Sequence, residues 1–199
     1  MKIIKWQNLL IIFSLLIGLQ NSFAFEKQSD GVLFKMQKQK DTDAKWIKIQ
    51  VCTDEIIRVI ASPVDSFSHR PSLMVVEKSW QPVKWNVKED GSIVEISTAN
   101  IVVHVDTITG AVMFYDSQNK LLLQENNIGG KVITSTNVLG EKTYHIQELF
   151  NSPENEAFYG LGQHQNGIMN YKGHDVDLWQ YNIVDVIPFL VSNNHYGIL

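Results

Sequence analysis

The chain has 199 residues, of which 44% are hydrophobic, 10% aromatic and 19% charged, and its formal net charge is −4. This is the composition of an ordinary globular domain, and an acidic chain without runs of lysine or arginine excludes a surface that follows nucleic-acid phosphates. We therefore expect neither nucleic acid nor another anionic polymer as a partner.

The N-terminal segment has the pattern of an export signal. Lys2 and Lys5 supply positive charge, an apolar run follows at 9–19, and Ser22 and Ala24 are small residues placed before a cleavage point. A membrane span needs about 20 apolar residues, so this run is too short to be one. The pattern predicts a signal peptide at 1–24, a mature domain at 25–199, no membrane span, and export to the periplasm or the cell exterior.

Cys52 is the single cysteine, so the mature chain cannot form an internal disulfide and depends on burial for stability. It ends the alternating run 47–52, which indicates a small hydrophobe in the core or at a sheet edge. A catalytic thiol would need a base nearby, and we do not expect that role.

Short runs of alternating apolar and polar residues recur along the mature chain, as expected for strands with one buried face. In the first run, Ile47, Ile49 and Val51 face away from Lys48 and Gln50. The runs are rich in β-branched and aromatic residues, and no helical period of useful length appears. In chain order they are 45–51, 83–88, 92–98, 101–106 and 144–147, with short apolar stretches at 112–115 and 121–124.

Turn residues separate these runs. Asp90-Gly91 is a hairpin signal, Gly110 suits a turn with positive φ, and 127–130 closes a later gap. The segments 65–71 and 151–155 have the composition of a loop and of a linker between sub-sheets. Strands about 8–12 residues apart with such turns predict an all-β fold, an antiparallel β-sandwich or barrel of about twelve strands.

After residue 156 the chain becomes dense in Gly, His, Asn, Asp and aromatic residues, a composition typical of functional loops on a rigid β scaffold. If the backbone is extended, Asp175 and Asp177 project from one face roughly 6.6 Å apart, near the lower edge of the separation in inverting glycosidases. Nothing in the spacing prepares one as an acid and the other as a base. We expect loop carboxylates that are solvated or hydrogen-bonded.

His164 and His174 lie near these carboxylates. Their spacing matches no recognised set of metal ligands, so we expect no metal and no cofactor. The alternatives for both histidines are hydrogen bonds to the backbone of their own loop, or contact with a sugar.

Aromatic rings and amides alternate from Trp179 to Asn182, with Tyr171 nearby. Ring faces suit the C–H surface of a sugar, and amides suit its hydroxyls. In an extended strand Trp179 and Tyr181 share one face, while Gln180 and Asn182 share the other. One face is expected to be buried, by preference the aromatic one.

Four stretches of the mature chain match a known pattern: FYGLGQH at 158–164, LWQYN at 178–182, IPFLVS at 187–192 and HYGIL at 195–199, with a looser match at 103–116. With these stretches, the mature chain resembles the N-terminal β-sandwich of glycoside hydrolase family 31, which includes α-glucosidases and α-xylosidases. The resemblance covers roughly residues 30–199, and 178–182 looks most similar to bacterial α-xylosidases that act on xyloglucan fragments.

The resemblance implies a galactose-mutarotase-like sandwich followed by a (β/α)8 barrel, in which two aspartates hydrolyse α-glycosidic bonds with retention. Nothing here matches the family's nucleophile motif, so we expect no catalytic residue in this chain and no activity from it alone. The family's sandwich lends one loop to the rim of the sugar pocket, and the matching residues are Gln180, Tyr181 and Asn182. Many relatives carry an acidic side chain near the position of Asn182, whose amide can still donate and accept.

The partners implied by the resemblance are an oligosaccharide, either an α-xyloside or an α-glucoside, and the protein's own catalytic barrel. The alternative hypothesis is a stand-alone carbohydrate-binding β-sandwich module.

Overall fold

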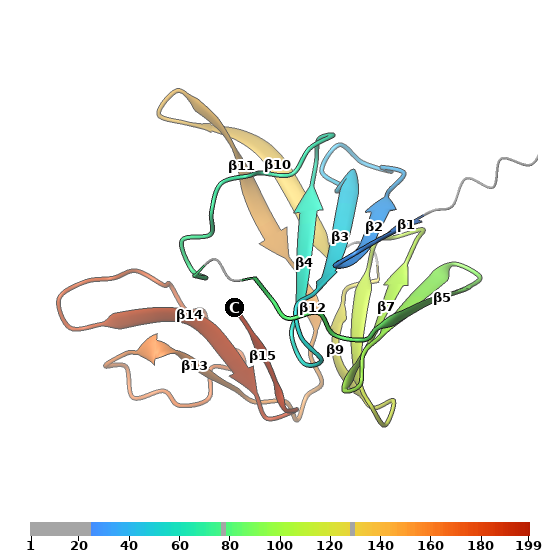
Figure 1. Ribbon diagram of the computed structural model, residues 1–199. Coiled ribbons are helices and arrows are strands. Elements are labelled where there is room, and N and C mark those ends of the chain that lie inside the picture. The colour runs from blue at the N-terminus through green and yellow to red at the C-terminus, as the bar shows by residue number, and fades with distance from the viewer. Residues whose placement is uncertain (1–24, 77–78, 128–129) are drawn as a thin grey trace, which may run out of the picture.

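A computed structural model describes residues 25–76, 79–127 and 130–199, and the expected signal peptide lies outside these ranges. All regular structure in the described ranges is antiparallel β, in fifteen strands that include several very short ones (Figure 1). The predicted antiparallel β fold is thus confirmed. The described residues contain no helix that is long and apolar enough to cross a bilayer.

Two sheets form the body of the molecule. The first has the order β1-β2-β3-β4, with β1 (Phe25–Gln28), β2 (Gly31–Lys35), β3 (Trp46–Val51) and β4 (Ile57–Ser62). The second has the order β12-β9-β8-β7-β6-β5, with β5 (Asn86–Asp90), β6 (Ile93–Ser97), β7 (Ile101–Asp106), β8 (Val112–Asp116), β9 (Leu121–Glu125) and β12 (Phe150–Asn151).

The core lies between these sheets, because the apolar face of each sheet is turned toward the other. Burying one such aliphatic or aromatic side chain contributes about 1.5–3 kcal/mol. The predicted alternation is confirmed in β3, where Lys48 and Gln50 remain half-buried on the outer face. The side chains with almost no exposed surface are Val32, Phe34, Ile47 and Ile49 from the first sheet, and Val94, Ile96, Val103, Val105 and Val112 from the second.

Two of the predicted turns are also present, whereas residues 128 and 129 of the turn predicted at 127–130 lie outside the described residues. Asp90-Gly91 joins β5 to β6, and Gly110 has φ 76° between β7 and β8. A Cβ at Gly110 would lie 2.9 Å from Ile47 Cδ1, the end of a side chain, so the positive φ is the main reason for glycine there. Cys52 is buried just after β3, and desolvation raises the pKa of its thiol, as expected for a core residue rather than a nucleophile.

Two smaller sheets extend from the sandwich (Figure 1). One is a hairpin of β10 (Lys131–Val138) and β11 (Glu141–Glu148). The other has the order β13-β14-β15, with β13 (Phe158–Gln163), β14 (Asp185–Ser192) and β15 (Tyr196–Ile198). The alternating run at 144–147 is a strand as predicted, but all of β11 is exposed, so its alternation does not mark a buried face.

Charged side chains connect the base of the β10–β11 hairpin to the sandwich. The buried Lys131 ammonium contacts Glu125 Oε2, which also accepts the Val112 N–H at 3.0 Å. Glu148 Oε1 lies 4.0 Å from Lys131 Nζ. The Glu148 side chain is 34% exposed, and its partial burial raises the pKa of Glu148 to about 7; the nearby Glu125 carboxylate adds to the rise while Lys131 opposes it.

Candidate functional site

A β-bulge shapes the strand that leads into the candidate loop. β13 and β14 pair with a register shift between Gly160 and Gly162. Gly162 has φ +99°, and a Cβ there would lie 2.0 Å from the Asp185 carbonyl oxygen. The glycines in the 158–164 stretch are therefore needed for the close approach of β14 and for the bend in β13.

Residues 170–172, in the middle of the long loop from 164 to 184, fix the loop to the rest of the domain. Asn170 Oδ1 accepts the backbone N–H groups of Phe158 and Lys172, each at 3.0 Å. Lys172 Nζ donates to the Pro153 carbonyl at 2.6 Å and lies over the Phe158 ring at 5.5 Å. Tyr171, which lies between Asn170 and Lys172 in the sequence, is buried and donates its N–H to the Phe158 carbonyl. This part of the loop is fixed to the start of β13.

Gln180 fixes the end of the same loop. Its Oε1 accepts the Val186 N–H at 2.9 Å, and its Nε2 donates to the Val184 carbonyl. Both polar atoms of the amide are thus engaged with the backbone at the start of β14. Gln180, Tyr181 and Asn182 are all exposed, and the side chain of Gln180 holds the loop in position.

The aromatic residues of this segment are exposed, with 68% of Trp179 and 55% of Tyr181 accessible. The expectation that the aromatic face is buried is therefore wrong. Residues 178–182 form no continuous strand, and only an isolated bridge joins Tyr181 to Val184. At this point the Gln180 amide, not a strand backbone, bonds the backbone groups at the start of β14. The segment therefore does not add a strand to the sheet.

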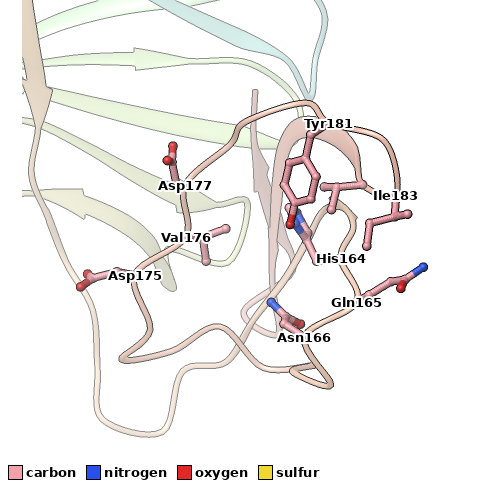
Figure 2. Close-up of a pocket in the computed structure, with 9 residues that line it drawn as sticks. His164, Gln165, Asn166, Asp175, Val176, Asp177, Tyr181 and Ile183 are labelled. Carbon is pink, nitrogen blue, oxygen red and sulfur yellow. The ribbon is translucent and has the colours of Figure 1, made fainter.

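The loop encloses a hollow of about 230 Å³ (Figure 2). In this view Tyr181 and His164 lie on one side and Asp175 and Asp177 on the other. His164 Nε2 lies 2.9 Å from the Leu161 carbonyl, which fixes the ring. Of the residues singled out from sequence, the structure brings His164, Asp175, Asp177 and Tyr181 to this hollow, and leaves His174, Trp179, Gln180 and Asn182 outside its lining.

The chemistry of the hollow is that of a binding surface. Asp175 and Asp177 are both exposed at the hollow. Carboxylates, the Tyr181 hydroxyl and the amides of Gln165 and Asn166 can bond sugar hydroxyls, and the Tyr181 ring offers an apolar face. Within the described ranges no three His, Cys, Asp or Glu side chains gather as a possible metal site.

Sequence reasoning missed Glu156, which ties the linker before β13 to the β14–β15 turn. Only 3% of the residue is exposed. Oε2 accepts Ser152 Oγ–H at 2.7 Å, while Oε1 accepts the Ser192 and Tyr196 hydroxyls and the Asn194 amide. Burial alone would raise the pKa of Glu156, but these hydrogen bonds outweigh it and hold the pKa below its usual value.

The fold and the loop together match a known family. Residues 47–199 match the model of the glycosyl hydrolase 31 N-terminal galactose mutarotase-like domain. The chain belongs to glycoside hydrolase family 31. It is the N-terminal galactose-mutarotase-like domain of that family, as the sequence resemblance implied, and this assignment is favoured over a stand-alone carbohydrate-binding module.

Relatives of this family 31 domain include an α-xylosidase of Saccharolobus solfataricus, 28% identical over 165 residues that cover 77% of this chain and 22% of that protein. Among solved structures, a GH31 α-xylosidase from Xanthomonas citri is 37% identical with a TM-score of 0.79, covering 86% of this chain and 18% of that one. A GH31 dextranase of Flavobacterium johnsoniae, solved with isomaltotriose, is 25% identical with a TM-score of 0.64, covering 87% and 21%. The chain thus spans less than a quarter of the length of these relatives.

Proposed function

We propose that this domain is the N-terminal part of an exported α-glycosidase, and that the whole protein cleaves α-xylosidic bonds in oligosaccharides. The observation that carries the proposal is the 37% identity to an α-xylosidase across most of the described fold. The α-xylosidase of Saccharolobus solfataricus supports the same substrate class. Cleavage of α-glucosides in place of α-xylosides is the nearest alternative within the family.

The catalytic carboxylates belong to the barrel that we propose follows this domain. The three-stranded sheet supports this, because Ile187, Phe189 and Val191 alternate along β14 and all three are exposed on one face. A row of exposed apolar side chains of this kind suits contact with another folded unit. The domain then acts as a support for the barrel and contributes no acid, base or nucleophile.

In this proposal the loop 164–184 forms part of the rim of the sugar pocket. Tyr181 and Asn182 contact the sugar, and Gln180 acts by holding them at the end of β14. Asp175 and Asp177 accept hydrogen bonds from hydroxyls without taking part in bond cleavage. The engaged amide of Gln180, beside two exposed neighbours, supports this division of roles.

The experiment compares hydrolysis of p-nitrophenyl α-xyloside and α-glucoside by the whole encoded protein. We expect a higher kcat/KM on the xyloside, and a drop of about tenfold for Tyr181→Ala and Asn182→Ala, because a lost polar contact costs about 1–3 kcal/mol. Ile108→Ala, which removes an exposed apolar side chain from the β7–β8 turn, serves as the control. Preference for the glucoside would overturn the substrate, and unchanged kcat/KM in both rim variants would overturn the role of the loop.

Export is proposed from the pattern of residues 1–24. Cell fractionation should place the protein outside the cytoplasm, with a mature N-terminus at Phe25. Deletion of 1–24 should retain it in the cytoplasm, and an unprocessed N-terminus at Met1 in the exported protein would contradict the assignment.

A further inference from the structure

The β10–β11 hairpin has one long strand edge without a neighbour. In the described residues β11 pairs only with β10, and all eight of its residues are exposed. Figure 1 shows the hairpin projecting from the sandwich. A two-stranded hairpin is marginally stable by itself in water, and an unpaired edge is a template for a further strand. This edge is therefore a candidate interaction surface.

The turn determines which backbone groups of β11 point outward. Val138 and Glu141 flank the two-residue loop and form a hydrogen-bonded pair, so alternation turns the N–H and C=O groups of residues 142, 144, 146 and 148 outward. The other strand agrees with this assignment, since Ile133, which faces Ile146, donates its N–H outward to the Thr42 carbonyl at 2.8 Å.

We propose that β11 pairs with β11 of a second copy of the chain, so that two hairpins form one four-stranded antiparallel sheet around a twofold axis. The outward-pointing backbone N–H and C=O groups of one β11 strand must face those of the other, which limits the possible registers. With His145 on the axis, Lys142 faces Glu148 of the second copy and Tyr144 faces its Ile146, each twice by symmetry. Charge then meets opposite charge, and apolar side chains meet each other.

Neighbouring twofold registers lose this complementarity. Placing Tyr144 on the axis sets Lys142 opposite Ile146, and placing Ile146 on the axis sets Glu148 opposite Tyr144. An axis at Thr143 sets Lys142 opposite Tyr144. Each of these registers pairs a charged side chain with an apolar or aromatic one, so the register centred on His145 is the one that the sequence of β11 favours.

The charges at the base of the hairpin favour the same partner. Among the described residues, Lys131 is the one cation that pairs with Glu125 and Glu148, and its ammonium is in contact with Glu125 but 4.0 Å from Glu148. The Glu148 side chain is 34% exposed, so a second cation can reach it. In the proposed sheet Lys142 of the second copy provides that cation on the face where Lys131 and Glu148 already lie.

Cysteine crosslinking in the whole encoded protein tests the register. Facing residues in a non-hydrogen-bonded antiparallel pair have Cα atoms about 4.5 Å apart, within the range of a disulfide. Under mild oxidation His145→Cys should give a disulfide-linked dimer. Thr143→Cys should not, because in this register the two copies of residue 143 lie four residues apart along the sheet, about 13 Å. The native Cys52 is buried. Failure of His145→Cys to crosslink faster than Thr143→Cys would overturn the proposal.

The charge pair gives an independent measurement. Lys142→Glu places like charges opposite each other twice and should raise the dimer dissociation constant about tenfold in sedimentation velocity. The control is Lys120→Glu, an exposed lysine just before β9, which should leave it unchanged. A wild-type protein that stays monomeric at micromolar concentration, because its own chain covers the edge, would overturn the proposal, as would equal effects of the two substitutions.

Discussion

Replacing Glu156 tests whether one buried carboxylate fixes the three-stranded sheet to the linker that follows β12. In Glu156→Gln the carbonyl oxygen can still accept the three bonds that Oε1 accepts, but the charge is lost. Hydrogen bonds to a charged group are worth about 1.5–3 kcal/mol and neutral ones about 0.5–1.5. A loss of about 1 kcal/mol for each of the three bonds at Oε1 lowers the free energy of unfolding by roughly 2–3 kcal/mol.

Glu156→Ala should cost more, about 4 kcal/mol, because four donors, three of them buried or half-buried, then lose their acceptor. Glu154→Gln is the matched control, since Glu154 lies in the same linker but is exposed, and its effect should stay within about 0.5 kcal/mol. The measurement is equilibrium urea unfolding followed by tryptophan fluorescence.

The pH dependence of the Glu156→Gln effect follows from the lowered pKa. A carboxyl group whose folded pKa lies below its unfolded value of 4.5 stabilises the fold above pH 4.5, and this contribution is lost as the pH falls through the folded value. The difference between wild type and Glu156→Gln should be constant between pH 6 and 8 and shrink in acid. A difference below 0.5 kcal/mol at pH 7, or one that does not shrink, would refute the reasoning.

Three other predictions concern single residues. The pKa of Glu148 is raised to about 7 in the fold, so folding takes up a proton between about pH 4.5 and 7. Wild-type stability therefore falls as the pH rises through that window. Thermal unfolding at pH 5 and at pH 8 should show that Glu148→Gln removes this pH dependence. Gly162→Ala should destabilise by at least about 2 kcal/mol, more than Gly140→Ala at about 1, because both have positive φ but only the first Cβ would meet a backbone oxygen; equal melting temperatures would contradict this. Cys52 should react with a thiol reagent only after unfolding, and rapid modification of the folded protein would disprove its burial.

The sandwich could be predicted from sequence because its strands follow a local rule. In β6 and β7 the apolar positions Val94, Ile96, Val103 and Val105 alternate with polar ones, and all four are buried. The turns at Gly91 and similar sites depend on residues within two or three positions of each other. Local patterns of this kind need no knowledge of the rest of the chain.

The candidate site was less predictable, because it depends on contacts between distant residues. The four donors to Glu156 come from both ends of the 152–196 region, and a glutamate in a polar linker is ordinarily exposed. Trp179 and Tyr181 alternate with amides as in a strand, but hydrogen bonds from the Gln180 side chain to β14 decide the local conformation. The same period-2 pattern in β11 gives a strand without a buried face, since burial depends on what lies opposite.

The loop 164–184 is anchored at two points, so the residues between these points can change more freely than those of the sandwich. Asn170 and Lys172 hold its middle, Gln180 holds the end next to β14, and the residues from 173 to 179 between them are almost all exposed. Mutations in that interval carry little folding cost, so natural variation can accumulate there without disturbing the core. In the function proposed above, changes in this interval would alter the contacts to the sugar while the scaffold stays the same.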